Sequence, residues 1–219
     1  MRKTLSTILI IAGVALILFP AAGSIYNDYM QKKMMSEFEE SVVKSYGEAN
    51  SALADLQSEP KLERQMTDVS VKDINSNNNS EIDIGSIIGI INIPKIEVNL
   101  PIKSGTTENV LLSAIGHMES TSMPGETGNA ALAGHRSHSF SKFFNRLDEV
   151  EINDPIFIKT IDSELEYQVY EKKVVKPTDM SVLKSSGDES IITLITCHPL
   201  YSNKQRLIVH AKLIKSEPL

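Results

Sequence analysis

The chain opens with one long apolar segment, Leu5–Ile25, within a stretch that carries no charged residue between Lys3 and Asp28. Its 21 residues would span roughly 31 Å as a helix, close to the ~30 Å hydrocarbon thickness of a bilayer. A helix in a soluble core is usually shorter and has a polar face. The pattern therefore predicts an N-terminal transmembrane signal anchor over residues 1–25. A cleaved signal peptide, with its site near Ala21–Gly23, is the alternative.

Residues 26–84 are expected to form a stalk helix followed by a flexible linker. Between Tyr26 and about Leu56, large apolar residues recur at loosely helical spacing among Glu, Lys and Ser, which predicts the helix. The stretch Ser58–Asp83 is polar and includes the run NSNNNS. It lacks enough large apolar side chains to build a core, so a spacer is predicted there.

After Gly85 the pattern changes to short segments rich in β-branched residues and separated by Pro, Gly, Asn and Asp. Such a pattern is typical of strands and turns, so a globular all-β domain is predicted over residues 85–219. The candidate strands are Ile87–Ile93, Glu97–Ile102, Ala130–Gly134, Ile156–Ile161, Leu165–Val175, Ile191–Cys197 and Arg206–Ile214. Seven strands, or eight if Leu165–Val175 is broken in two, predict a barrel or sandwich. Short helices are expected at Asn109–Ile115 and around Phe140–Leu147.

Length, charge and cysteine content narrow the function classes. The 219 residues allow one domain plus accessories. A formal net charge of -6 argues against nucleic-acid binding, because no stripe of Lys and Arg is available to displace counterions. The single cysteine, Cys197, excludes an intrachain disulfide and a thiolate-rich zinc cage. A lone thiol outside the cytoplasm is open to oxidation, and reactivity is one reason to keep it.

Cys197 is expected at the end of a strand, where it could react. Alternation along Ile191–Cys197 places Cys197 on the same face as Thr193, and Pro199 stops the strand shortly afterwards. Strand ends beside loops hold reactive groups rigidly and still expose them to substrate. A structural cysteine buried in the core is the alternative.

A nucleophilic thiol needs a neighbouring base or cation, and histidines offer two candidates. His198 is adjacent to Cys197, but neighbouring side chains on a strand point to opposite faces, so a solvent-facing position is expected for it. His135 ends the strand Ala130–Gly134, and Gly134 permits a close approach to another chain segment. His135 is therefore a candidate base, although a strand-end histidine bonded to a backbone carbonyl fits the pattern equally well.

Arg206 begins the last candidate strand, on the face opposite to the apolar residues Leu207 and Val209. Its guanidinium could bind a substrate carbonyl or a developing oxyanion, or could simply cover a solvated sheet face. His135, His138 and Cys197 could also supply three zinc ligands, but their spacing matches no standard pattern. No metal and no cofactor is predicted.

Several motifs in order resemble those of sortases. TLITC at Thr193–Cys197 is similar to the TLxTC motif of that family, and AGHR at Ala133–Arg136 resembles the segment that carries its histidine. Arg206, in QRLIV, completes the order His, Cys, Arg, and the similarity covers roughly Ile87–Ile214. Class D sortases are the most similar class. No C-terminal transmembrane segment and no aspartate-aromatic lid motif are seen, which argues against pilin polymerisation.

The resemblance implies a closed eight-stranded β-barrel whose groove accepts an LPxTG-like sorting signal on a secreted protein. Cys197 would be the nucleophile that attacks the Thr carbonyl, His135 the general acid and base, and Arg206 the group that holds the oxyanion. The acyl group would pass to an amine of a peptidoglycan precursor. The anchor would keep this extracellular domain at the cell membrane. The segment Lys176–Glu189, where sortases usually build specificity, is short and does not reveal the sorting motif.

Two other functions fit part of the pattern. A thiol hydrolase would pass the same thioacyl group to water instead of to an amine. A catalytically silent, membrane-tethered β-barrel could bind cell-wall or partner proteins, with Cys197 as a buried structural residue.

Overall fold

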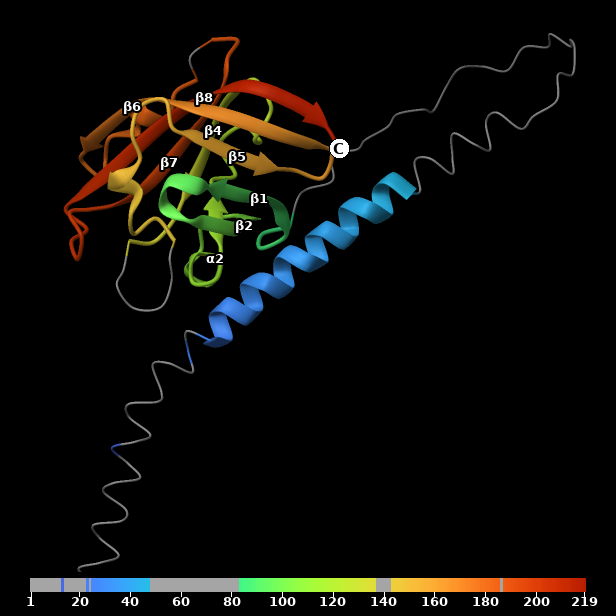
Figure 1. Cartoon of the computed structure of the whole chain (residues 1–219). Coiled ribbons are helices and arrows are strands. Elements are labelled where there is room, and N and C mark those ends of the chain that lie inside the picture. Colours follow the sequence, from blue (N-terminus) through green and yellow to red (C-terminus); the bar gives the residue numbers. More distant parts are fainter. Residues whose placement is uncertain (1–12, 14–22, 24, 48–82, 137–142, 186) are drawn as a thin grey trace, which may run out of the picture.

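Eight strands close into a single β-barrel in the computed structural model of the chain (Figure 1). The structure describes residues 13, 23, 25–47, 83–136, 143–185 and 187–219. The strands are β1 (Ile87–Ile93), β2 (Val98–Ser104), β3 (Ile115–His117), β4 (Gly128–Ala133), β5 (Pro155–Lys159), β6 (Ser163–Val175), β7 (Ser190–His198) and β8 (Gln205–Pro218). The all-β barrel expected from the resemblance is confirmed.

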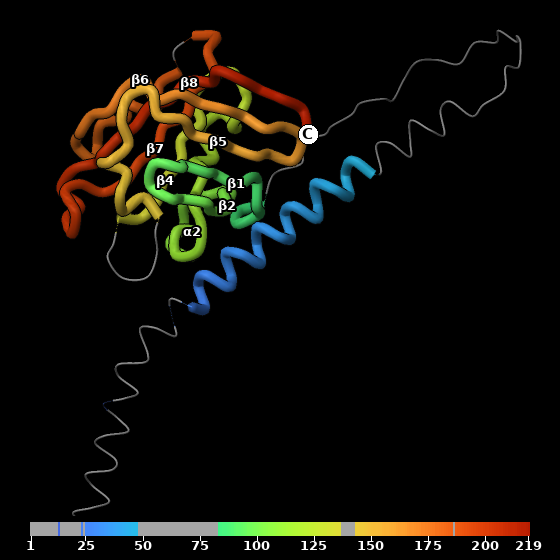
Figure 2. The backbone as a smooth tube through the Cα atoms, in the orientation of Figure 1, coloured from blue at the N-terminus to red at the C-terminus, as the bar shows by residue number. Residues whose placement is uncertain are grey.

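The strands follow the order β1-β2-β3-β4-β7-β8-β6-β5 around the barrel. Two neighbouring pairs are parallel, β2 with β3 and β4 with β7. The remaining pairs are antiparallel. The tube view shows how β6, β7 and β8 form one side of the barrel while β1 and β2 lie on another (Figure 2). The parallel pair β4 and β7 brings together two strands that are far apart in the sequence.

The barrel interior is filled by alternate side chains of its strands. On β7, Ile192 and Leu194 are fully buried in the main apolar cluster, while Thr193 points to the outer face. Leu194 lies between Leu132 of β4 and Val209 of β8, its register partners, and both belong to the same cluster. The alternation predicted for this strand is therefore confirmed.

The predicted helix Asn109–Ile115 is mostly wrong. Only α2 (Glu108–Leu111) is helical there, with the hydroxyl of Thr107 accepting a capping bond from Val110. Ile115 instead begins the short strand β3, where it pairs with Ile102 of β2. Pairing with a distant strand overrides the helical spacing of the local sequence.

The predicted helix around Phe140–Leu147 is also wrong over the residues that the structure describes, 143–147. Phe143 and Phe144 lie in a bend, and a short 3-10 helix, η2 (Leu147–Glu149), follows. Phe143, Phe144 and Leu147 are buried in the main cluster. Their spacing of three and four therefore reflects a turn that packs on the core. Two other 3-10 helices are η1 (Pro94–Ile96) and η3 (Met180–Leu183).

Among the described residues, no helix is both long and apolar enough to cross a membrane. The transmembrane segment predicted over residues 1–25 lies almost entirely outside the described part of the chain. The linker predicted before residue 83 lies mostly outside it as well. The stretch Leu165–Val175, for which a break was considered, is one continuous strand with two shifts in its register to β8.

Residues 25–47 form the predicted N-terminal helix, which lies beside β1 and β2 (Figure 1). Phe38 and Val42 pack with Ile90 of β1 in a second apolar cluster. At the ends of the contact, the amide of Gln31 donates to the Ser113 carbonyl, at 3.3 Å, and the Tyr46 hydroxyl donates to the Asp162 carbonyl, at 2.9 Å. The helix is thus held on the barrel by contacts along its length.

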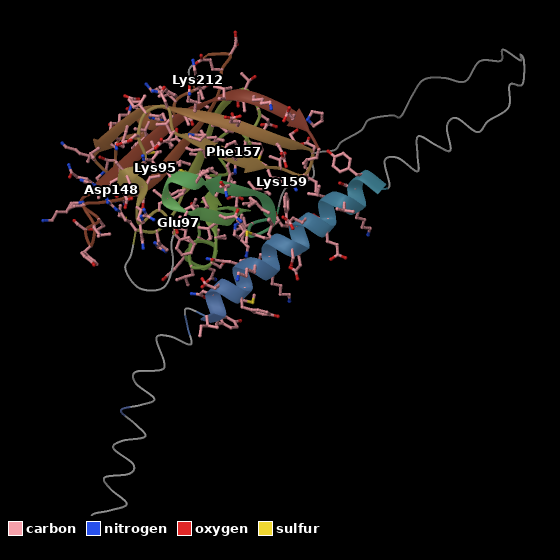
Figure 3. All side chains as sticks on the ribbon, viewed as in Figure 1. Lys95, Glu97, Asp148, Phe157, Lys159 and Lys212 are labelled. Carbon is pink, nitrogen blue, oxygen red and sulfur yellow. The ribbon has the colours of Figure 1, made fainter. Side chains whose placement is uncertain are left out.

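A cavity of about 520 Å³ lies beside this contact, lined by Met35 from the helix and by Phe157 and Lys159 from β5. Figure 3 shows Phe157 and Lys159 on the part of the barrel nearest the helix. Buried apolar side chains on this face of the helix, Phe38 and Val42 among them, account for the helical spacing of apolar residues in the sequence.

Two adjacent valines test this docking. Val42 is 5% exposed and Val43 is 72% exposed. We expect Val42→Ala to lower the free energy of unfolding by about 1.6 kcal/mol more than Val43→Ala, since two buried methyl groups contribute ~0.8 kcal/mol each. The two changes alter helix propensity alike, so the difference measured in denaturant reports burial alone. Equal effects of the two substitutions would show that the helix does not dock.

Candidate active site

Three neighbouring strands bring His135, Cys197 and Arg206 to one edge of the barrel. Ala133 of β4 pairs with Ile195 of β7 in a parallel ladder. His135 and Cys197 each lie two residues further along their chains, and Cys197 pairs directly with Arg206 of the antiparallel β8. Because side chains alternate along strands, all three lie on the outer face, opposite to the apolar interior.

Cys197 is the second-last residue of β7 and is half-buried, with a free thiol. Its neighbour Thr196 points inward and is buried, and the Thr196 hydroxyl donates to the Gly134 carbonyl at 2.7 Å. The Gly134 amide also donates to the Ile195 carbonyl at 3.0 Å. These bonds hold the end of β7 against the segment that carries His135. The predicted position of the thiol at a strand end is confirmed.

His135 is half-buried, and both its ring and its backbone contact the segment that begins at Phe143. Its ring meets the Phe143 ring edge-on, with centroids 6.4 Å apart, and its carbonyl accepts from the Phe144 amide at 3.1 Å. Gly134 permits the approach of the segment that follows, since a Cβ there would lie 2.7 Å from Cδ2 of Phe144 and 2.8 Å from Cδ1 of Ile115. The close approach expected at Gly134 is therefore present.

Arg206 is half-buried and is anchored to its own turn. Its Nη1 donates to the carbonyls of Asn203 and Gln205, both at 3.0 Å. Among the residues that the structure describes, no hydrogen bond or ion pair involves its Nε or its Nη2, so these two nitrogens are not engaged in the turn. A guanidinium carries its donors in a fixed planar fork, so the rest of this fork can serve a carbonyl or an oxyanion next to Cys197.

Arg136, which was not singled out from the sequence, is buried next to the segment of His135. Its Nη2 forms an ion pair with Asp148 at 2.8 Å, and its Nη1 lies 3.0 Å from Nδ1 of His198. His198 is half-buried and bonded to this cation, so it faces solvent less fully than expected. The available signal was alternation, because Arg136 continues the inward set of Leu132 and Gly134.

A buried polar network lies on the outer face of the same strand, around Thr193, before the chain reaches Cys197. The Thr193 hydroxyl donates to Oδ1 of Asn129 at 2.7 Å and lies 2.9 Å from Nδ1 of His210. Nδ2 of Asn129 donates to the Val182 carbonyl at 3.0 Å. Val182 belongs to η3, so this network attaches the connection between β6 and β7 to the sheet surface. This connection is the segment Lys176–Glu189, in which substrate specificity was expected to lie.

The other histidines are not gathered at this edge. His117 is buried, and its Nε2 lies 2.8 Å from the Ser122 carbonyl, so it has a structural partner. His138, considered above as a zinc ligand, lies outside the described residues. Within the described part of the chain, no group of three or more His, Cys, Asp or Glu side chains is placed to hold a metal ion.

His210 is buried on the outer face between β6 and β7. Burial lowers its pKa below the ordinary value of 6.5, and the nearby Lys173 lowers it further, while Glu171 acts in the opposite sense. Nε2 of His210 lies 3.7 Å from Glu171, and its ring stacks on Tyr170. Since the Thr193 hydroxyl donates its hydrogen to Asn129, the Thr193 oxygen accepts a hydrogen bond from Nδ1–H of His210.

Known proteins with similar sequences were found by comparison with family models and with curated relatives. A family model described as "Sortase domain" matches residues 91–214. "Sortase A" of Listeria monocytogenes is 30% identical over 220 residues, covering 100% of this chain and 94% of the relative. "Sortase D" of Bacillus subtilis is 30% identical over 135 residues, covering 60% of this chain and 66% of the relative.

Solved structures agree with these matches. The Sortase D5 transpeptidase of Clostridium perfringens has a TM-score of 0.64 and 34% sequence identity, covering 84% of this chain and 98% of that chain. Sortase A of Corynebacterium diphtheriae, a lid mutant, has a TM-score of 0.58 and 32% identity, covering 63% of this chain and 75% of that chain. The family match over residues 91–214 spans the positions of all three residues at the edge.

His210 generates a prediction about pH. An unfolded chain protonates this imidazole near its ordinary pKa of 6.5, whereas the folded chain keeps it neutral to lower pH. As pH falls through about 6.5, the unfolded state binds a proton that the folded state does not bind, so the free energy of unfolding decreases. We expect His210→Gln to show a shallower decrease than the unsubstituted chain when denaturant unfolding is measured from pH 7.5 to 5. Parallel curves for the two proteins would contradict this.

Proposed function

The chain belongs to the sortase family of cysteine transpeptidases, and from this premise we propose that Cys197, His135 and Arg206 are its catalytic residues. The observation that supports this most strongly is their common position at one edge of the barrel, with His135 just after β4 and with Cys197 of β7 in direct register with Arg206 of β8. The substrate proposed is an LPxTG-like sorting signal of a secreted protein.

The first half of the reaction forms a thioester. The thiol of Cys197 passes its proton to His135, and the thiolate attacks the carbonyl carbon of the substrate Thr while the carbonyl oxygen becomes an oxyanion. When the carbonyl re-forms, the bond from carbon to the leaving nitrogen breaks, and His135 gives that nitrogen a proton. The products of this half are a thioacyl enzyme and the released C-terminal part of the sorting signal.

The second half transfers the acyl group. The amine of a peptidoglycan precursor attacks the thioester carbon, while His135 takes the proton that the amine loses. The bond from carbon to sulfur then breaks and Cys197 is regenerated. No redox change takes place and no cofactor enters the balance. Water in place of the amine would give hydrolysis, so the acceptor decides between transfer and release.

Arg206 stabilises the charge that develops on the substrate oxygen. Its Nη1 is held by two backbone carbonyls of its own turn, so the fork is oriented before substrate arrives. Donors fixed in advance towards a developing oxyanion are among the largest contributions to catalysis. The register between Arg206 and Cys197 supports this role, because a substrate carbonyl at the sulfur would lie beside the guanidinium.

The proposal extends to the location of the enzyme. Residues 1–25 would form a transmembrane signal anchor that holds the catalytic domain at the outer face of the cell membrane, near its acceptor. The apolar segment Leu5–Ile25 supports this placement, since it is long enough to span a bilayer. Membership of class D is supported by the likeness to the Sortase D of Bacillus subtilis and the Sortase D5 of Clostridium perfringens.

A trapped thioester tests the nucleophile. We expect the purified full-length chain to gain the mass of the acyl fragment when it is mixed with a sorting-signal peptide, and to give a ligated product when an amine is added. Because Cys197 is the single cysteine, Cys197→Ala should abolish both results. Ligated product from Cys197→Ala would overturn the mechanism. Free acid formed at the same rate under saturating amine would instead identify a hydrolase.

Arg206 can be compared with an arginine outside the site. We expect Arg206→Gln to lower kcat by about 10²–10³-fold, the usual effect of removing an oxyanion donor. Arg146 is the matched control, since it lies on another segment and pairs with Glu149 and Glu97 at the surface. Arg146→Gln should leave kcat within about twofold of the unsubstituted chain. Equal losses from the two substitutions, measured by steady-state ligation, would exclude a specific role for Arg206.

A further inference from the structure

Arg136 lies behind the catalytic edge, and its contacts reach the segments of both His135 and Cys197. We propose that Arg136 is a positioning residue that holds the general base and the nucleophile at their working separation. This inference rests on the proposed function, because it assigns a role within the same site. It adds a residue that does not touch the substrate and acts through the backbone of two residues that do.

The guanidinium of Arg136 joins three parts of the chain. Its Nε donates to the Asn145 carbonyl at 3.2 Å, and its Nη2 pairs with Oδ1 of Asp148 at 2.8 Å. Its Nη1 lies 3.0 Å from Nδ1 of His198 and makes a longer contact of 3.5 Å to the carbonyl of Cys197. The segment after β4, the segment before η2 and the end of β7 therefore meet at one side chain.

These contacts bear directly on the catalytic pair. Arg136 follows His135 in the chain, so the backbone of His135 cannot shift without moving the guanidinium or breaking its bonds. The Nη1 group meets the backbone of the nucleophile on the other side. Side chains of consecutive extended residues point in opposite directions, so Arg136 supports the site from within while His135 lies on the outer face.

The side chain of Arg136 is only 4% exposed, although it is charged. A buried guanidinium is unfavourable unless its donors are satisfied, and removal of one partner of such a pair is costly. Asp148 supplies the opposite charge from the surface, where its side chain is 51% exposed and is labelled in Figure 3. The ion pair thus connects a buried guanidinium to a carboxylate at the surface, and the charge of Arg136 is balanced by that of Asp148.

The geometry of the cluster requires arginine. Arginine carries donors on three nitrogens in one plane, and here all three nitrogens are used by different partners. Lysine keeps the charge but has a single nitrogen on a flexible stem, so it cannot meet Asn145, Asp148 and His198 together. Because arginine only donates, Nδ1 of His198 is the acceptor in this contact.

The test uses the full-length chain and a ligation assay with a sorting-signal peptide and an amine. We expect Arg136→Lys to lower kcat by about 10–100-fold, because a displacement of about 1 Å at reacting groups can cost that much. KM for the peptide should stay within about threefold, since Arg136 does not touch the substrate. Arg146→Gln, which removes an exposed guanidinium ten residues along the chain, is the matched control and should retain its kcat.

A loss of folded protein would also lower the apparent kcat, so a second readout is needed. We expect the pH profile of kcat/KM to change shape in Arg136→Lys, because the coupling between His135 and Cys197 is altered. A smaller amount of folded enzyme scales the profile without changing its shape. If Arg136→Lys does not fold, Asp148→Asn takes its place, and we expect it to lower kcat by about 3–10-fold with KM unchanged, since Asp148 holds the exposed end of the cluster.

The outcomes separate this inference from the proposed function. A folded Arg136→Lys with unchanged kcat and unchanged pH profile would overturn the positioning role, and so would an unchanged Asp148→Asn where the lysine variant fails to fold. Ligation by Cys197→Ala would instead overturn the proposed function, whatever Arg136 does. Loss of ligation in Cys197→Ala, together with the expected defect in Arg136→Lys and normal kcat in Arg146→Gln, supports both.

Discussion

The parallel pairing of β4 with β7 is the constraint on which the site depends. Because the two strands run in the same direction and in register, both end at the same edge of the barrel. β8 begins at that edge and runs back along β7, which places Arg206 opposite Cys197. Alternation then directs the three polar side chains outward, while the residues between them fill the apolar core. The proposed catalytic arrangement is thus a consequence of strand direction and register.

Around this edge, polar side chains attach connecting segments of the chain to the strands. On the outer face, Asn129 and Thr193 bind the connection that contains η3 through the Val182 carbonyl. Behind the edge, Arg136 binds the segment that carries Asp148. Both anchors are side chains on or next to strands whose other face is packed in the core.

Much of this could be predicted from local sequence patterns, and the rest depended on distant contacts. β1 was predicted with its observed bounds, and the position of Cys197 at the end of β7 followed from alternation. The three-residue strand β3 was missed because it is too short to show a period and is formed by pairing with β2. The closed barrel came from family resemblance, since strand order leaves no trace in local spacing.

The role of Arg136 could not be read in advance for a similar reason. Its partners lie 9 to 62 residues away along the chain, so only the folded structure brings them together. The predicted transmembrane anchor and spacer concern residues outside the described part of the chain, and they stay predictions together with the sorting motif.

A crystal structure of the full-length chain, covalently trapped with a sorting-signal peptide, would test the account most directly. The account predicts the peptide carbonyl carbon bonded to Sγ of Cys197, with an imidazole nitrogen of His135 and the guanidinium of Arg206 on opposite sides of it, each within hydrogen-bond distance of substrate atoms. A trapped peptide whose reacting carbonyl lies beyond the reach of His135 and Arg206 would contradict it.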